Sequence, residues 1–87
     1  MNQLNLAFII YSHLRGINCL IGFKNYFASA SDDGSINIWK VYNDKIELKN
    51  NLLFEDKMIV GLSYDDEDNV LYFNSYDYPE IICISNI

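Results

Sequence analysis

Hydrophobic and polar residues follow one another along this chain in short runs, without the spacing of an amphipathic helix. No window keeps apolar residues at positions i, i+3, i+4 and i+7 over three turns. The apolar runs are rich in Ile, Val, Tyr and Phe, and turn residues separate them about every 8–12 positions. This pattern predicts an all-β protein built from antiparallel strands.

The same pattern sets the expected strands and turns. The predicted strands cover residues 4–11, 17–21, 26–31, 35–41, 46–54, 58–63, 70–74 and 81–85. The Asp-Asp-Gly sequence at 32–34 predicts a tight turn, because an Asp-Gly pair tolerates positive φ. Asn50 and Asn51 are expected to interrupt the fifth strand, and residues 64–69 are expected to form an acidic loop.

An internal repeat connects the two halves of this strand pattern. Residues 17–20 superimpose on residues 59–62 with an offset of 42, and the offset becomes 44 where Asp33 aligns with Asp77. The longer acidic loop of the second half explains the change. A four-stranded repeat of about 40–45 residues has the period of a propeller blade.

One of the two repeats carries a family motif. Residues 13–20 (His-Leu-Arg-Gly-Ile-Asn-Cys-Leu) and 27–39 (Phe-Ala-Ser-Ala-Ser-Asp-Asp-Gly-Ser-Ile-Asn-Ile-Trp) resemble one WD repeat of the WD-repeat β-propeller family. Two positions depart from that pattern, since Ser12 stands where Gly is usual and Lys40 where Asp is usual. The second repeat is degenerate, with Glu55 in place of the His, Phe73 in place of Ser29 and Ile84 near the Trp position.

The resemblance implies antiparallel four-stranded propeller blades. Residues 1–12 would be the outer strand of an incomplete blade, residues 13–54 a complete blade, and residues 55–87 a degenerate three-stranded partial blade. About two blades are too few to close a ring, because propellers use about 4–8.

The resemblance also implies a structural hydrogen-bond network of His13, Ser29, Asp33 and Trp39. The turn Asp would accept from backbone N–H groups and from the His ring, and the His would bond the Ser hydroxyl. The Trp indole N–H, which only donates, would bond the same hydroxyl. Replacing Asp33 is therefore expected to destabilise the protein rather than inactivate it.

Ser29, His13 and Asp33 are also the residue types of a hydrolase triad, but we expect no enzyme. Ser29 lies in the middle of a predicted strand without the glycines of a nucleophile elbow, and Trp39 accounts for its hydroxyl. No second His and no paired Cys lies at the spacing of metal ligands. The run 65–69 has Val70 and Tyr76 where an EF-hand needs Gly and Glu, so no metal and no cofactor are expected.

Charge and composition exclude further classes. The 87 residues include six basic and twelve acidic ones, and no Lys/Arg cluster suited to a nucleic-acid backbone is present. No apolar run approaches the ~20 residues of a membrane helix, and no basic leader suggests a signal peptide. An intracellular chain, cytoplasmic or nuclear, is therefore expected. Cys19 and Cys83 lie in apolar runs and are interpreted as buried thiols, with a disulfide between them left open.

The sequence predicts a non-catalytic protein–protein interaction scaffold within a larger assembly. Its partners would be proteins and further propeller blades from the same or another chain. Two alternatives are a small lectin-like oligomer that assembles itself and a truncated propeller fragment without function. A third is an enzyme subunit whose chemistry lies elsewhere. The candidate partner-binding residues lie in predicted loops: Leu14, Arg15, Lys24, Asn25, Asp65, Asp66, Glu67 and Asp68.

Overall fold

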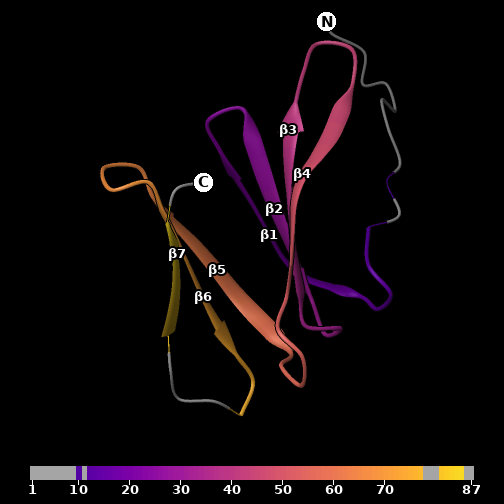
Figure 1. Cartoon of the computed structure of the whole chain (residues 1–87), viewed down its shortest axis with the longest axis vertical. Helices are drawn as coiled ribbons and strands as arrows, with labels where there is room; N and C mark the ends of the chain where they lie inside the picture. The colour runs from indigo at the N-terminus through magenta and orange to yellow at the C-terminus, as the bar shows by residue number, and fades with distance from the viewer. Residues whose placement is uncertain (1–9, 11, 78–80, 86–87) are drawn as a thin grey trace, which may run out of the picture.

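The computed structural model describes residues 10, 12–77 and 81–85, which form two antiparallel sheets (Figure 1). The first sheet has the order β1-β2-β3-β4 and the second has the order β5-β6-β7. The strands are β1 (Ile17–Phe23), β2 (Tyr26–Ser31), β3 (Ser35–Val41), β4 (Ile46–Leu53), β5 (Ile59–Asp65), β6 (Val70–Ser75) and β7 (Ile81–Ser85). The described residues contain no helix, and the sheets are not closed into a barrel or ring, so the all-β prediction is confirmed.

Tight turns join the strands of the first sheet. Lys24, in the two-residue turn between β1 and β2, has a φ of 54°, a conformation that is costly for a residue with a Cβ. Gly34, after β2, has a φ of 85° and donates its N–H to the Ser31 carbonyl at 3.2 Å. The turn predicted at 32–34 is therefore present, with glycine at the position that needs positive φ.

Two strands of the first sheet differ from the sequence prediction. β1 continues past Ile21, because Gly22 pairs with Phe27 and extends the hairpin to its turn. The interruption expected at Asn50 and Asn51 was wrong, since β4 is continuous. The register instead shifts between Ile38 and Trp39, leaving Lys49 as an extra residue in a β-bulge.

In the second sheet, the acidic loop is shorter than the sequence predicted. β5 includes Tyr64 and Asp65, which pair with Leu71 and Val70, so the loop comprises residues 66–69 only. The Tyr64 ring stacks on Phe23 with centroids 4.2 Å apart, which is why this residue belongs to the strand rather than to the loop. The strand predicted at residues 4–11 falls outside the described residues except for Ile10, which belongs to no strand.

The core lies between the two sheets, which pack face to face with β1 beside β5 (Figure 1). Successive side chains of a strand point to opposite faces, so alternate residues of each strand enter this interface. The fully buried or nearly fully buried apolar residues there are Phe23, Ala28, Ala30, Ile36 and Ile38 from the first sheet and Ile59, Leu71 and Phe73 from the second.

Each sheet also has an outer face, turned away from the other sheet. Ser29 and Trp39 lie on the outer face of the first sheet, because Ala28 and Ile38 beside them point into the core. Their repeat equivalents in the second sheet, Phe73 and Ile84, instead pack against the first sheet. The face that the second sheet buries is thus equivalent to the face that the first sheet turns outward.

The two cysteines differ from the prediction in one respect. Cys19 is half-buried and packs against the core, whereas Cys83 is exposed. Cys83 pairs with Tyr72, between residues that alternate into the core, so its thiol lies on the outer face of the second sheet. The prediction of a buried Cys83 was wrong, because that side of the second sheet has no covering sheet.

Candidate functional site

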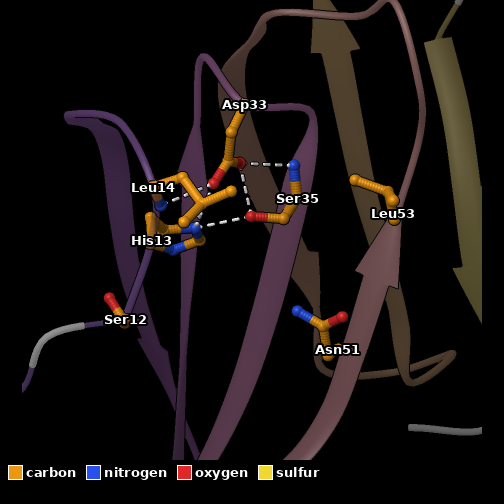
Figure 2. Close-up of a pocket in the computed structure, with 7 residues that line it drawn as sticks. All are labelled: Ser12, His13, Leu14, Asp33, Ser35, Asn51 and Leu53. Atoms are coloured by element: carbon orange, nitrogen blue, oxygen red, sulfur yellow. Dashed lines mark hydrogen bonds and ion pairs between the residues drawn. The ribbon is translucent and has the colours of Figure 1, made fainter.

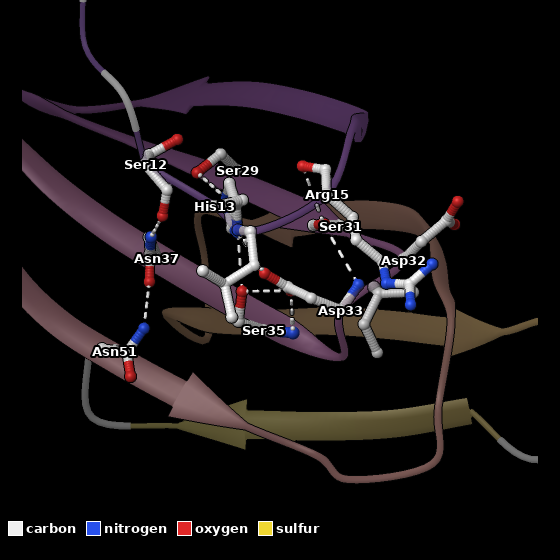
Figure 3. Close-up of polar contacts among 12 residues, drawn as sticks. Ser12, His13, Arg15, Ser29, Ser31, Asp32, Asp33, Ser35, Asn37 and Asn51 are labelled. Carbon is white, nitrogen blue, oxygen red and sulfur yellow. Dashed lines mark hydrogen bonds and ion pairs between the residues drawn. The ribbon is translucent and has the colours of Figure 1, made fainter.

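The outer face of the first sheet carries a row of polar side chains from the β2–β3 hairpin. Ser29, Ser31, Ser35 and Asn37 are all buried, and Asp33 stands in the turn between the strands. We call these five residues the polar clamp. They share one face because every second residue of the hairpin points the same way. Buried polar groups need hydrogen-bond partners, and the chain segment 12–15 supplies at least one to each of these five residues (Figure 3).

Each residue of the segment 12–15 contacts the polar clamp. Asn37 donates its side-chain N–H to the Ser12 carbonyl at 2.6 Å, and Asn51 of β4 in turn donates to the Asn37 side-chain oxygen. The Leu14 backbone N–H donates to Asp33 Oδ2 at 2.9 Å, and the Ser31 hydroxyl donates to the Arg15 carbonyl at 3.3 Å. The segment is therefore held across the sheet mainly through its backbone.

His13 links the two ends of the polar clamp. Its Nε2 lies 2.8 Å from Ser29 Oγ and its Nδ1 lies 2.6 Å from Ser35 Oγ. Only 1% of the ring's side-chain surface is exposed. A neutral imidazole has one donor and one acceptor nitrogen, so both nitrogens have a partner in this arrangement.

The direction of every hydrogen bond in this row follows from its two ends. The Trp39 indole can only donate, and it donates to Ser29 Oγ at 3.3 Å. The Asp33 carboxylate can only accept, and it accepts the Ser35 hydroxyl proton through Oδ1. Because the Ser35 hydroxyl proton goes to Asp33, Ser35 Oγ accepts from His13 Nδ1–H. The other ring nitrogen, Nε2, then accepts the hydroxyl proton of Ser29. We assign the Nδ1–H tautomer on this basis.

Asp33 is the acid of the polar clamp, and its surroundings lower its pKa. Burial alone would raise its pKa, but hydrogen bonds from the Ser35 hydroxyl, the Ser35 N–H at 2.8 Å and the Leu14 N–H outweigh that effect. They lower its pKa to about 2, because they favour the ionised form. His13 adds a smaller contribution, with its Nδ1 3.7 Å from Asp33 Oδ2.

The structure brings together the four residues of the network suggested by the family resemblance, with one difference in connection. Ser35 stands between the His13 ring and the Asp33 carboxylate and carries the hydrogen bond that was expected to be direct. Sequence reasoning missed Ser31, Ser35, Asn37 and Asn51. For the first three, the signal was available in the alternation of polar residues through 29, 31, 35 and 37.

A shallow cavity of about 370 Å³ opens beside the polar clamp (Figure 2). Its lining residues are Ser12, His13, Leu14, Asp33, Ser35, Asn51 and Leu53. Leu14 is 95% exposed and Leu53 is 58% exposed, so apolar side chains border a floor of polar groups that are already hydrogen-bonded. The polar groups of this cavity thus have hydrogen-bond partners within the chain, and exposed apolar side chains form its edge.

The predicted loop residues fall at opposite ends of the sheets. Leu14 and Arg15 lie beside the 32–34 turn, and both line a surface cavity with Asp32 and Asp33. Lys24 and Asn25 form the turn at the other end of β1, where Lys24 Nζ reaches Asn69 Oδ1 at 3.4 Å.

The acidic residues lie near the Lys24 end. Asp66 lines a groove of about 420 Å³ with Lys24, Tyr64 and residues of β1 and β5. Asp65 belongs to β5, and Glu67 and Asp68 lie in the 66–69 turn. The predicted partner-binding residues therefore make two separate surfaces rather than one.

Comparison with family models, characterised proteins and solved structures gives no match to this chain. Over the residues that the structure describes, no three His, Cys, Asp or Glu side chains are grouped so that they could hold a metal ion. The same residues include no helix long and apolar enough to cross a membrane.

Proposed function

We propose that this chain is a non-catalytic protein-interaction module of the WD-repeat type. In this proposal its two sheets are successive blades of an intracellular assembly, and further β-sheet from the same or another chain covers the outer face of the first sheet. The observation that carries the proposal is the combination on that face of a polar clamp whose hydrogen bonds are made internally and a set of exposed apolar side chains.

The hydrogen bonding of the polar clamp argues against catalysis. The Ser29 hydroxyl donates to His13 and accepts from Trp39, so it is neither exposed nor directed at a substrate. A serine nucleophile needs an open approach and an oxyanion site beside it. Here the seryl and imidazole groups lie beneath the segment 12–15, where they act as ties between strands.

The apolar residues around the polar clamp support a docking role. Leu20 is 63% exposed, Leu48 is 45% exposed and Leu53 is 58% exposed, and each pairs with a residue of the outer face. Phe27 stacks beside Trp39 on the same face, with centroids 6.0 Å apart. Exposed apolar side chains on one sheet face, beside polar groups that are already hydrogen-bonded, support a protein interaction site there.

Affinity purification of the tagged chain from its source cells, followed by cross-linking, tests this function. We expect a stoichiometric protein partner whose capture falls at least tenfold for the double variant Leu20→Arg, Leu53→Arg. Tyr76→Arg is the matched control, because Tyr76 is 61% exposed in the turn after β6, away from the outer face of the first sheet. Equal capture by the double variant and the wild type would contradict the proposal, as would hydrolytic turnover that Ser29→Ala abolishes.

A further inference from the structure

The charges of the chain are divided unequally between its two sheets. Residues 10–54, which contain the first sheet, hold five basic and four acidic residues. Residues 55–87, which contain the second sheet, hold one basic and eight acidic residues. If two copies of the chain met through their second sheets, the acidic sheets would repel one another. A contact between the first sheet of one copy and the second sheet of another brings unlike charges together.

Specific clusters underlie this asymmetry. Lys40, Lys45 and Lys49 surround the Tyr42 ring at the β3–β4 turn, with ammonium nitrogens 5.2, 5.0 and 5.9 Å from its centroid. The acidic residues 66–68 gather at the β5–β6 turn of the second sheet. Both turns lie at the same end of the molecule (Figure 1). The electrostatic difference is thus a property of the two sheets and not of one end.

The outer face of the second sheet is nevertheless poor in charge. Among the described residues of β5, β6 and β7, Asp65 is the only charged one. Tyr72 and Cys83 form a cross-strand pair on this face, and Ile81, paired with Asn74, is 71% exposed. In a region this acidic, a largely uncharged sheet face with an exposed isoleucine indicates a contact surface.

The packing of the second sheet on the first within one chain shows how a face of one sheet fits the opposite face of another. The second sheet docks the face that bears Phe73 and Ile84 on the first sheet. The first sheet turns the equivalent face, bearing Ser29 and Trp39, outward. Conversely, the outer face of the second sheet is equivalent to the face of the first sheet that the core covers. A second docking of the same kind therefore needs only another copy of the chain.

We propose that the outer face of the first sheet binds the outer face of the second sheet of another copy, head to tail. The inference deepens the proposed function, on which it rests, by naming the partner. The interface is heterologous, because different surfaces of the two copies meet, and it therefore generates a ring or an open array. A ring of about 4–8 sheets would contain two to four copies of the 10.1 kDa chain.

Two complementary variants test this arrangement by light scattering after size exclusion. Leu20→Arg blocks the outer face of the first sheet, and Ile81→Arg blocks the outer face of the second. We expect the wild type to form a discrete oligomer and each variant alone to associate at least tenfold more weakly. Mixed together, the two variants should form a one-to-one dimer, because each retains the face that the other has lost.

Other assemblies give different results in the same experiment. If two first sheets met face to face, Ile81→Arg would associate like the wild type, which would overturn the proposal. A folded wild-type chain that stays monomeric at millimolar concentration, or a mixture that stays monomeric, would overturn it as well. Tyr76→Arg is the control and should associate normally. Leu48→Arg and Ser63→Arg form a second pair if either first variant fails to fold, judged by circular dichroism and Trp39 fluorescence.

The exposed Cys83 thiol provides an independent measurement on the unlabelled chain. Head-to-tail docking covers Cys83, so its alkylation should slow at least tenfold in the wild-type oligomer relative to monomeric Leu20→Arg. Concentration-independent alkylation would contradict the docking. This outcome is distinct from failure of the proposed function, because a chain that does not bind itself can still capture a different protein through Leu20 and Leu53.

Discussion

The three strands of the second sheet match the first three strands of the first sheet in layout, but the two sheets secure equivalent faces by opposite means. In the first sheet, this face carries Ser29 and Trp39, and the polar clamp ties it to the segment 12–15. In the second sheet, the same positions hold Phe73 and Ile84, which pack against the first sheet. Equivalent faces of the two repeats are therefore covered in two ways: by directed hydrogen bonds to the segment 12–15 in the first sheet, and by apolar contact with another sheet in the second.

This difference predicts how well each sheet tolerates amino-acid substitutions. Apolar contact is undirected, so the buried face of the second sheet tolerates substitutions of similar volume. The hydrogen-bond row from Trp39 to Asp33 has a single direction, and removing one member leaves its neighbours buried without partners. We therefore expect the first sheet to be sensitive to small polar changes and the second sheet to be insensitive to them.

The strongest test of this contrast uses one glycine from each sheet. A Cβ at Gly34 would collide with the Phe54 carbonyl and lie 2.9 Å from the Lys57 carbonyl, and its φ of 85° disfavours any side chain. We expect Gly34→Ala to cost at least about 3 kcal/mol, because the colliding atoms are backbone. A Cβ at Gly61 would meet the Asn74 side chain, which can rotate toward solvent, so Gly61→Ala should cost less than about 1 kcal/mol.

Urea denaturation followed by Trp39 fluorescence measures both free energies of unfolding. Gly16→Ala is the control, since no heavy atom of the described residues beyond its two chain neighbours lies within 4 Å of its Cβ position, and it should leave the midpoint nearly unchanged. Similar losses for Gly34→Ala and Gly61→Ala would show that the 32–34 turn is no more constrained than the strand of the second sheet.

The next test compares the equivalent aspartates. Asp33→Asn replaces one acceptor oxygen with a donor N–H₂ that faces either the Ser35 donors at the Oδ1 position or the Leu14 N–H at the Oδ2 position, and we expect a loss of about 2 kcal/mol. Asp77→Asn should change the free energy of unfolding by less than about 0.5 kcal/mol. Asp77 is exposed, and its φ of 68° suits asparagine as well as aspartate. Thermal unfolding of the two variants near neutral pH makes the comparison.

The pH dependence of the same pair isolates the charge of Asp33. Its folded pKa of about 2 lies below the ordinary value of about 3.9, so the ionised carboxylate contributes stability above about pH 4. That contribution is lost as the pH falls from about 4 through the folded pKa. The stability gap between the wild type and Asp33→Asn should therefore narrow from about pH 4 to about pH 2. A constant gap would mean that Asp33 acts through its shape alone.

Strand positions could be predicted from the sequence because each strand has local causes. Alternation of Ile36 and Ile38 with Asn37 indicates a strand with one apolar face, and Asp33-Gly34 supplies the turn residue with positive φ. The errors have long-range causes. β5 reaches Asp65 because Tyr64 stacks on Phe23, about forty residues earlier, and nothing near Tyr64 in the sequence encodes that partner.

The candidate site was predictable in part for the same reason. The family resemblance supplied His13, Ser29, Asp33 and Trp39, but not Ser35 as the link between the His ring and the carboxylate. Asn51 was missed because its hydrogen bond to Asn37 depends on the β3–β4 register, which the bulge at Lys49 sets. The exposure of Cys83 depended on which face of β7 has a covering sheet, and strand periodicity alone does not determine that.

The smallest expected changes in the free energy of unfolding come from alanine substitutions of two equivalent serines. The two changes should differ in sign. Ser31 Oγ accepts the Asp33 N–H at 3.1 Å and donates to the Arg15 carbonyl, so Ser31→Ala should cost about 1 kcal/mol. Ser75 occupies the same repeat position, is 5% exposed, and its hydroxyl has no hydrogen-bond partner among the residues that the structure describes. Ser75→Ala should therefore be neutral or stabilise by up to about 1 kcal/mol, because it removes a buried polar group without a partner. Paired urea midpoints measure both signs, and a loss for Ser75→Ala as large as that for Ser31→Ala would mean that the two sheets secure this position alike.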